Sequence, residues 1–389
     1  MTKAGLLLPL FSAFLVTAAP TTLPPGDAAP FIARIEAVQT AGRGEFDKLT
    51  LPALMQQLQV PGLSIAVVQD FKIHWAKAYG LADVSSGRLL DTNTRFQAAS
   101  ISKPVTAMAA MRMVEAGQLD LDKDINSFLT SWQVPVSELT RQQSVTARAL
   151  FSHTSGADDG FGFPGYAPQA ALPTVVQILN GQAPSNVGKV LFARAPYAEY
   201  KYSGGGTMIM QQAMMDLCRC AFAQLMQTTV LTPLQMANSA FEYMPAAQSA
   251  ALAHDEQGKR MPAPWHLYPE QAAAALWTTP TDLAKFIIEL QTALRAEKGQ
   301  LLSRQSATEM TTPVRVGPFA VGLKIEQRGQ EQYFSHSGAN WGYRAWMTGH
   351  LSKGYGMIIM TNSDNGMALM NQLADRITNA YGWNAESSK

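Results

Sequence analysis

The sequence predicts a mixed fold, of α+β or α/β class, in which both chain ends build one antiparallel sheet with flanking helices. Near the N-terminus, strand-like runs at 63–68 and 73–79 are separated by a three-residue turn, a pattern typical of a β-hairpin. Near the C-terminus, strand-like runs again precede a closing helical pattern at 368–381. The segment from Lys103 to about Leu294 has mostly helical patterns. We therefore expect a helical subdomain inserted between the two sheet-forming ends.

The individual elements follow from local patterns. A helical pattern covers 32–59, a short strand is expected at 94–97, and an Ala- and Met-rich helix at 105–116 is ended by Gly117. The strands expected near the C-terminus cover 319–325, 333–335, 343–349 and 357–361. At 389 residues and 42.1 kDa, the chain can bury a large core, as one domain or two intergrown ones.

Residues 1–19 have the composition of a secretory signal. Lys3 is followed by short apolar runs at 4–10 and 14–16 and by small residues that end at Ala19. The apolar stretch is too short and too broken to span a bilayer comfortably. We expect cleavage near Ala18 or Ala19 and an exported protein, periplasmic or secreted, with an uncleaved anchor as the alternative. The Pro- and Thr-rich residues 20–31 are typical of a flexible spacer.

Charge and cysteine content limit the partners and the chemistry. The 30 basic and 29 acidic residues nearly balance, so nothing favours nucleic acid or an anionic membrane surface as a partner. The only cysteines, Cys218 and Cys220, are separated by one residue, a spacing that disfavours a mutual disulfide. We expect both to be free, buried and inert.

Ser100 and Lys103 are the most informative pair in the chain. They are three residues apart at the start of the expected helix, a spacing that places two side chains on one helix face. A serine needs a nearby base to become a nucleophile, and an apolar wall lowers the pKa of a lysine toward that of a useful base. The alternative is an ordinary helix start, with Ser100 as the N-cap and Lys103 in solvent.

Two further segments supply candidate site residues. Tyr202 precedes Gly204-Gly205-Gly206, and a nearby lysine would hold its phenol partly ionised, able to exchange a proton with Ser100. His336 and Gly338 follow a strand-like run, and Gly338 leaves room for a substrate against a strand edge. Each of these features alone is also compatible with a structural role.

In this order, the three motifs resemble those of the serine β-lactamase and penicillin-binding-protein superfamily, most closely its class C-like and esterase branch. The family motifs Ser-x-x-Lys, Tyr-x-Asn and Lys-Thr-Gly or His-x-Gly correspond to Ser100 with Lys103, Tyr202, and His336 with Gly338. The stretches 150–156 and 340–344 also look like the family. The resemblance covers roughly 45–385.

The resemblance implies a β-lactamase-like domain over 45–385, after a linker and the start of the first helix at 20–44. Its sheet part would cover about 45–105 and 300–385, and its helical part about 106–299. It also implies that Ser100 forms an acyl-enzyme while Lys103 and Tyr202 share its proton, either one being the acylation base. The backbone N–H groups of Ser100 and Ala339 would form the oxyanion hole.

Two departures from the family pattern bear on the substrate. Gly204 replaces the asparagine of Tyr-x-Asn, and His336 replaces a lysine that would attract a carboxylate. We therefore expect a serine hydrolase for small esters or amides, with esters slightly favoured. The alternatives are a D-alanyl or D-amino-acid peptidase or weak β-lactamase acting on cell-wall or lactam substrates, and a penicillin-receptor-like module without turnover.

Other motifs lead to no further function. His153 lies in a stretch that the resemblance marks as structural, and the glycine pattern at 160–165 lacks the preceding strand of a dinucleotide site. The six histidines show no metal-ligand spacing, so no metal and no cofactor are predicted. The oligomeric state leaves no mark in the sequence.

Overall fold

The computed structural model describes residues 27–40, 44–158, 162–242, 245–314 and 316–383. The expected export signal at 1–19 lies outside these residues. Within them, no helix is both long enough and apolar enough to cross a bilayer.

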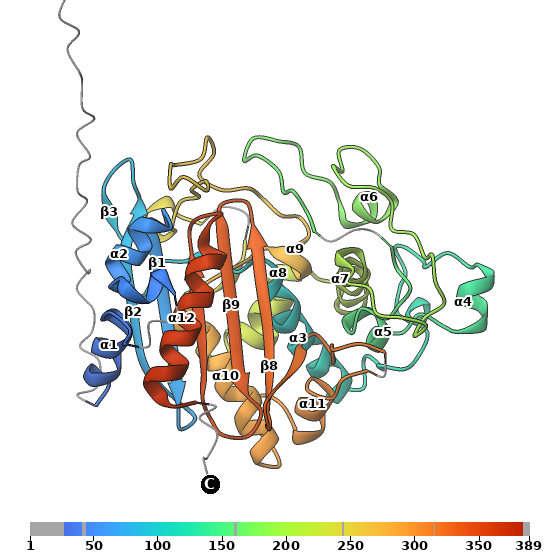
Figure 1. The fold of residues 1–389 in the computed structure, drawn as a ribbon. Helices are drawn as coiled ribbons and strands as arrows, with labels where there is room; N and C mark the ends of the chain where they lie inside the picture. The colour runs from blue at the N-terminus through green and yellow to red at the C-terminus, as the bar shows by residue number, and fades with distance from the viewer. Residues whose placement is uncertain (1–26, 41–43, 159–161, 243–244, 315, 384–389) are drawn as a thin grey trace, which may run out of the picture.

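A seven-stranded antiparallel sheet forms the centre of the molecule (Figure 1), which confirms the predicted fold class. Its order across the sheet is β3 (Arg88–Leu89), β2 (Lys72–Asp83), β1 (Gly62–Gln69), β10 (Gly356–Thr361), β9 (Tyr343–His350), β8 (Glu331–Asn340) and β7 (Lys324–Arg328). The two chain ends meet where β1 pairs with β10, with Leu63 opposite Thr361.

The predicted hairpin is confirmed, with a turn shorter than expected. Gln69 pairs with Lys72, so that only Asp70 and Phe71 form the turn. Both have positive φ values, 53° and 61°, as the central residues of a type I′ turn require. The backbone twist of such a turn matches the twist of the two strands that it joins.

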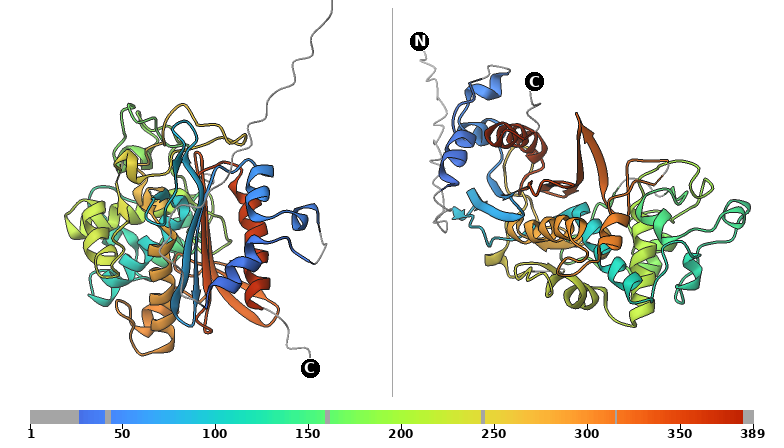
Figure 2. Two further views of the ribbon diagram at one scale, coloured as in Figure 1. Left: turned by 90° about the vertical axis from the view of Figure 1, so that its left-hand side faces the viewer. Right: turned by 90° about the horizontal axis from the view of Figure 1, so that it is seen from below.

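Helices cover both faces of the sheet (Figure 2). On one face lie α1 (Ala29–Glu36), α2 (Leu51–Gln57) and α12 (Gly366–Tyr381), and on the other α10 (Pro280–Arg295) and α3 (Ser102–Glu115). Alternate residues of β1 enter two different cores: Ile65 packs with the α12 side, and Ala66 with the α10 side. Burial on both faces explains why β1 is a nearly continuous apolar run.

The middle of the chain is less uniformly helical than expected. Its other α-helices are α4 (Glu138–Gln142), α5 (Ala147–Phe151), α6 (Val175–Asn180), α7 (Gly204–Cys218), α8 (Phe222–Met226), α9 (Gln271–Ala274) and α11 (Arg304–Glu309). A small sheet crosses this part, with β6 (Leu276–Thr278) between β4 (Phe96–Gln97) and β5 (Ala240–Phe241). The shorter helical turns are η1 (Glu45–Lys48), η2 (Ala99–Ile101), η3 (Ile125–Ser127), η4 (Gln227–Leu231) and η5 (Ala247–Ser249).

Several predicted boundaries were wrong. The helical pattern expected over 32–59 is divided into α1, η1 and α2. The spacer expected to reach residue 31 is already helical from Ala29, because Pro30 occupies the first turn of α1, where a proline favours helix formation. The strand expected at 319–325 begins only at Lys324, and the apolar residues before it are buried in a non-strand segment.

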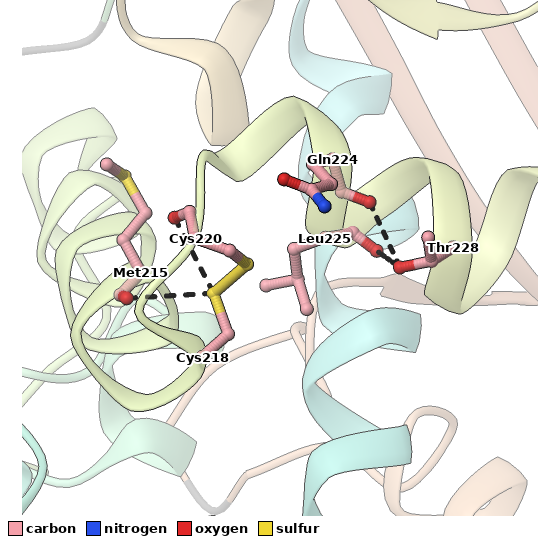
Figure 3. The surroundings of a disulfide bond; sticks show 6 residues. All are labelled: Met215, Cys218, Cys220, Gln224, Leu225 and Thr228. Carbon is pink, nitrogen blue, oxygen red and sulfur yellow. Dashed lines mark hydrogen bonds between the residues drawn. A yellow bond between two sulfur atoms is a disulfide. The ribbon is translucent and has the colours of Figure 1, made fainter.

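The two cysteines are joined by a disulfide, which corrects the expectation of free thiols (Figure 3). Helix α7 ends at Cys218, and Arg219 adopts the left-handed conformation with φ 53°. This reversal brings the Cα atoms of Cys218 and Cys220 to 5.2 Å, within the range that a disulfide requires. Sequence spacing alone does not show the reversal.

Candidate active site

Ser100 lies on a strained connection between β4 and α3. Ala99, immediately before it, has φ 50°, a conformation that costs free energy for a residue with a Cβ atom. Ser102 holds this turn in place, because its hydroxyl donates to the Ala99 carbonyl at 2.6 Å and accepts from the Leu276 N–H at 3.0 Å. The Ser100 hydroxyl is thereby presented at the first turn of the helix.

Lys103 reaches Ser100 as its spacing predicted. The Nζ atom donates to Ser100 Oγ at 3.0 Å and to the Ala273 carbonyl at 3.0 Å. The lysine is only 3% exposed, so the alternative of a solvated surface charge is wrong. Helix α9, which carries Ala273, is held by α3 through Thr106 and by α7 through Gln211.

Tyr202 approaches the same hydroxyl from the start of α7. It is hydrogen-bonded to Ser100, and its ring centroid lies 5.2 Å from Lys103 Nζ. His153 stacks on the Tyr202 ring at 4.1 Å and accepts a hydrogen bond at Nδ1 from the Ser203 N–H at 3.2 Å. The structure therefore brings together the three residues predicted as catalytic.

Strand β8 forms another wall of this site. The strand extends to Asn340, five residues beyond the expected end, and so carries His336, Gly338 and Ala339. A Cβ atom at Gly338 would lie 3.1 Å from the Ser100 nitrogen and 3.0 Å from Ala99 Cβ. Only glycine permits this close approach of the strand to the segment that carries Ser100.

The outer edge of β8 is open beside Ser100. Strand β7 begins at Lys324, opposite Ser335, and pairs with residues 331–335 of β8. Residues 336–340 of β8 pair with β9 on one edge. On the other edge, none of the described strands pairs with them. Ala339 lies on this open stretch directly after Gly338, which suits the predicted oxyanion hole. Its participation there stays a prediction.

Comparison with known proteins identifies the family. The Beta-lactamase family model matches residues 49–381. The chain belongs to the beta-lactamase family. This result confirms the superfamily suggested by the motifs.

The individual relatives are distant. Protein flp of Staphylococcus aureus is 21% identical over 315 residues, covering 79% of this chain and 61% of the relative's length. Esterase EstB of Burkholderia gladioli is 34% identical over 130 residues, covering 33% of this chain and 30% of EstB. A D-amino acid amidase from Ochrobactrum anthropi has the same fold, with a TM-score of 0.68, 20% identity, and coverage of 87% and 99% of the two chains.

Burial determines the charge state of Tyr202. Desolvation raises the pKa of the Tyr202 phenol well above its usual value of 10, and the hydrogen bond with Ser100 opposes this change only weakly. The expectation of a partly ionised phenol was therefore wrong. In the resting site, Tyr202 is a neutral phenol that can donate a proton.

His336 is neutral as well. Burial, and secondarily the charge of Lys103, lower the pKa of His336 to about 3. Its Nδ1 lies 2.7 Å from the Ser337 carbonyl, a distance that requires the proton to be on Nδ1. The Nε2 atom is then a bare acceptor, and it has no hydrogen-bond partner among the described residues.

Three contributors to the site were missed or undervalued in the sequence. His153 orients Tyr202, the Ala273 carbonyl orients Lys103, and Phe319 packs edge-on against both His153 and His336, at 4.9 and 5.8 Å. A backbone carbonyl and an aromatic contact leave no pattern in the sequence. His153 was assigned a structural role, and its contact with Tyr202 makes that role a positioning one.

Proposed function

We propose that the protein is a serine hydrolase that forms an acyl-enzyme on Ser100. The observation that carries this proposal is the buried contact of 3.0 Å between Lys103 Nζ and Ser100 Oγ. A serine hydroxyl becomes an effective nucleophile when a base accepts its proton within hydrogen-bond distance. Family membership supports the same chemistry.

The acylation step follows from the charge states. Ser100 Oγ attacks the carbonyl carbon of the substrate while its proton passes to Lys103, which must begin the step as a neutral amine. The tetrahedral intermediate then collapses and breaks the bond to the leaving group. Tyr202, a neutral phenol, donates its proton to the departing oxygen or nitrogen and is reprotonated by Lys103.

Deacylation reverses these roles. Water attacks the acyl carbon and gives one proton to the Lys103 and Tyr202 pair, and Ser100 Oγ leaves and recovers its proton. The products are the acid and the free enzyme. The N–H groups of Ser100 and Ala339 would stabilise the oxyanion in both steps.

Esters are the favoured substrates. A neutral His336 gives no fixed positive charge for a substrate carboxylate, and Gly204 provides no amide side chain to bind an acylamido group. The partial likeness to EstB supports an esterase. The fold shared with a D-amino acid amidase keeps small amides as the second candidate.

We also propose that the protein is exported. The composition of residues 1–19 supports this proposal, and the disulfide between Cys218 and Cys220 fits an oxidising compartment. The mass of the protein recovered from the periplasm or medium should correspond to a chain cut near Ala19. A chain of full length confined to the cytoplasm would contradict export.

A three-substrate assay tests the proposed activity. A p-nitrophenyl ester, a chromogenic cephalosporin and a D-alanyl-D-alanine peptide are compared with wild type, Ser100→Ala and the control Ser127→Ala, which alters an exposed serine outside the site. We expect ester turnover by wild type and the control, and none by Ser100→Ala. Turnover of the peptide alone would refute the ester preference. Turnover by Ser100→Ala would refute the nucleophile.

A further inference from the structure

Gly204 stands where the family motif has an asparagine, and the Phe163 ring packs against it. Gly204 is the first residue of α7 and is buried. A Cβ atom at this position would lie 2.7 Å from Cε2 and 2.9 Å from Cζ of Phe163. Real Cβ atoms do not approach other atoms this closely, so the Phe163 ring in its present place and an asparagine at 204 exclude each other, and the ring would have to move.

The backbone beside Phe163 is firmly anchored. Tyr166 and Leu267 exchange two backbone hydrogen bonds of 2.9 and 2.7 Å. The carbonyl of Pro164 lies 2.9 Å from His266 Nδ1, and that of Gly165 accepts from Asn186 Nδ2 at 2.8 Å. The backbone that follows Phe163 is thus held by several independent contacts, which limits how far the ring can move.

The ring lies close to the reacting groups. Gly204 is two residues from Tyr202, whose hydroxyl is hydrogen-bonded to Ser100. Phe163 is half-buried, so part of the ring stays open to solvent or to a ligand. An apolar ring at this position provides dispersion contacts and removes the polar partner that an acylamido group would need.

We propose that Phe163 is a specificity-determining residue that forms an apolar wall of the acyl pocket. The preferred substrates are then esters of unsubstituted aliphatic or aromatic acids, and acids with an acylamido group beside the carbonyl are disfavoured. This inference rests on the proposed acyl-enzyme at Ser100. It goes beyond that proposal because it names the acyl group.

The test compares two acyl groups on one leaving group. The ratio of kcat/KM for p-nitrophenyl butyrate to that for p-nitrophenyl N-acetylglycinate is measured for wild type, Phe163→Ala and Phe163→Leu. We expect wild type to favour butyrate, Phe163→Ala to lower the ratio at least tenfold, and Phe163→Leu, which keeps an apolar wall, to stay within threefold of wild type. Phe71→Ala, in the β1–β2 turn, is the matched control and should keep the wild-type ratio.

A double variant tests the mutual exclusion directly. In Phe163→Ala/Gly204→Asn, the space left by the ring receives an amide, and we expect the ratio to fall a further tenfold in favour of N-acetylglycinate. Gly204→Asn alone should lose activity on both esters, because the ring blocks the new side chain.

Contrary results separate the two proposals. A wild-type enzyme without preference for butyrate, or a ratio unmoved in Phe163→Ala, would overturn the role of Phe163. Ester turnover that survives Ser100→Ala would instead overturn the acyl-enzyme. Circular dichroism of each variant confirms that a changed ratio comes from a folded protein.

Discussion

Two buried basic side chains in this protein have opposite surroundings. Arg376, in α12, is 2% exposed and donates to backbone carbonyls of the N-terminal segment, including those of Phe46 at 2.9 Å and Leu49 at 2.8 Å. Lys103 is 3% exposed and donates to the carbonyl of Ala273 and to the Ser100 hydroxyl.

The difference lies in what each side chain touches. The guanidinium of Arg376 donates to several backbone carbonyls of the N-terminal segment, which stabilises the packing of α12 on that segment. Lys103 contacts a hydroxyl that can lose a proton. We therefore expect the burial of Arg376 to serve stability and that of Lys103 to serve reactivity, and substitutions should separate the two.

The largest expected effect is on catalysis. Lys103→Met removes the proposed base while it keeps most of the side-chain volume. We expect ester kcat/KM to fall by about 10⁴-fold, the upper range for the loss of general base catalysis. The unfolding midpoint should not decrease, because methionine fills most of the same volume without a buried polar group to desolvate. Steady-state assays measure kcat/KM, and thermal melts measure the unfolding midpoint. A large drop in stability with activity retained would show that Lys103 serves stability and not reactivity.

Arg376→Met should have the opposite profile. Several carbonyls lose a donor, at about 1–3 kcal/mol for each one left unsatisfied, and we expect the free energy of unfolding to fall by about 4 kcal/mol. The kcat of the folded fraction should stay near that of wild type. Arg304→Met is the matched control, since Arg304 also donates to carbonyls, of Arg295 and Ala296, but at the surface. Denaturant titration should show less than about 1 kcal/mol for this control.

Glu270 is a buried acid that extends the comparison to a group whose charge depends on pH. Neither carboxylate oxygen has a hydrogen-bond partner among the described residues, and burial raises the pKa of Glu270 to about 7. The folded state therefore holds a proton that the unfolded chain releases from about pH 4.5 upward. Stability from this group is fully present below pH 4.5 and is lost as the pH rises through 7, by up to about 3 kcal/mol.

Glu270→Gln should abolish this pH dependence. The variant has no proton to lose, so its stability relative to wild type should increase between pH 5 and pH 8. Thermal unfolding of both proteins across this range gives the difference in their stability at each pH. Groups that titrate in both proteins do not contribute to this difference. A constant difference between the two proteins would show that Glu270 titrates normally.

Tyr202→Phe should give the smallest of these effects. The variant keeps the ring that stacks on His153 but loses the proton donor, and we expect about a 100-fold decrease in kcat with ester substrates. The loss should be smaller for esters with a good leaving group, such as p-nitrophenol, than for alkyl esters. An equal loss for both would contradict the role of Tyr202 as proton donor to the leaving group.

Much of the fold could be predicted because burial leaves periodic patterns. The β1–β2 hairpin, the strands β9 and β10 and helix α12 are long apolar or amphipathic segments, and the structure confirms them. The spacing of Ser100 and Lys103 predicted their contact because η2, which carries Ser100, runs directly into α3, which carries Lys103.

Other features depend on tertiary structure and leave no such pattern. The disulfide requires the reversal at Arg219, and the neutral phenol of Tyr202 results from burial by segments distant in sequence. The contact between Phe163 and Gly204 arises from a loop packed on a helix that begins 41 residues later in the chain. In the sequence, Gly204 marks only a missing amide, and the structure shows the Phe163 ring packed against it.

The most direct test of the central claim is the rate and position of labelling by a fluorophosphonate, followed by intact-mass and peptide mass spectrometry. We expect one adduct, on Ser100 of the wild-type protein, and formation at least 100-fold slower in Lys103→Met. A label on another residue, or labelling of Lys103→Met at the wild-type rate, would show that Lys103 does not activate Ser100.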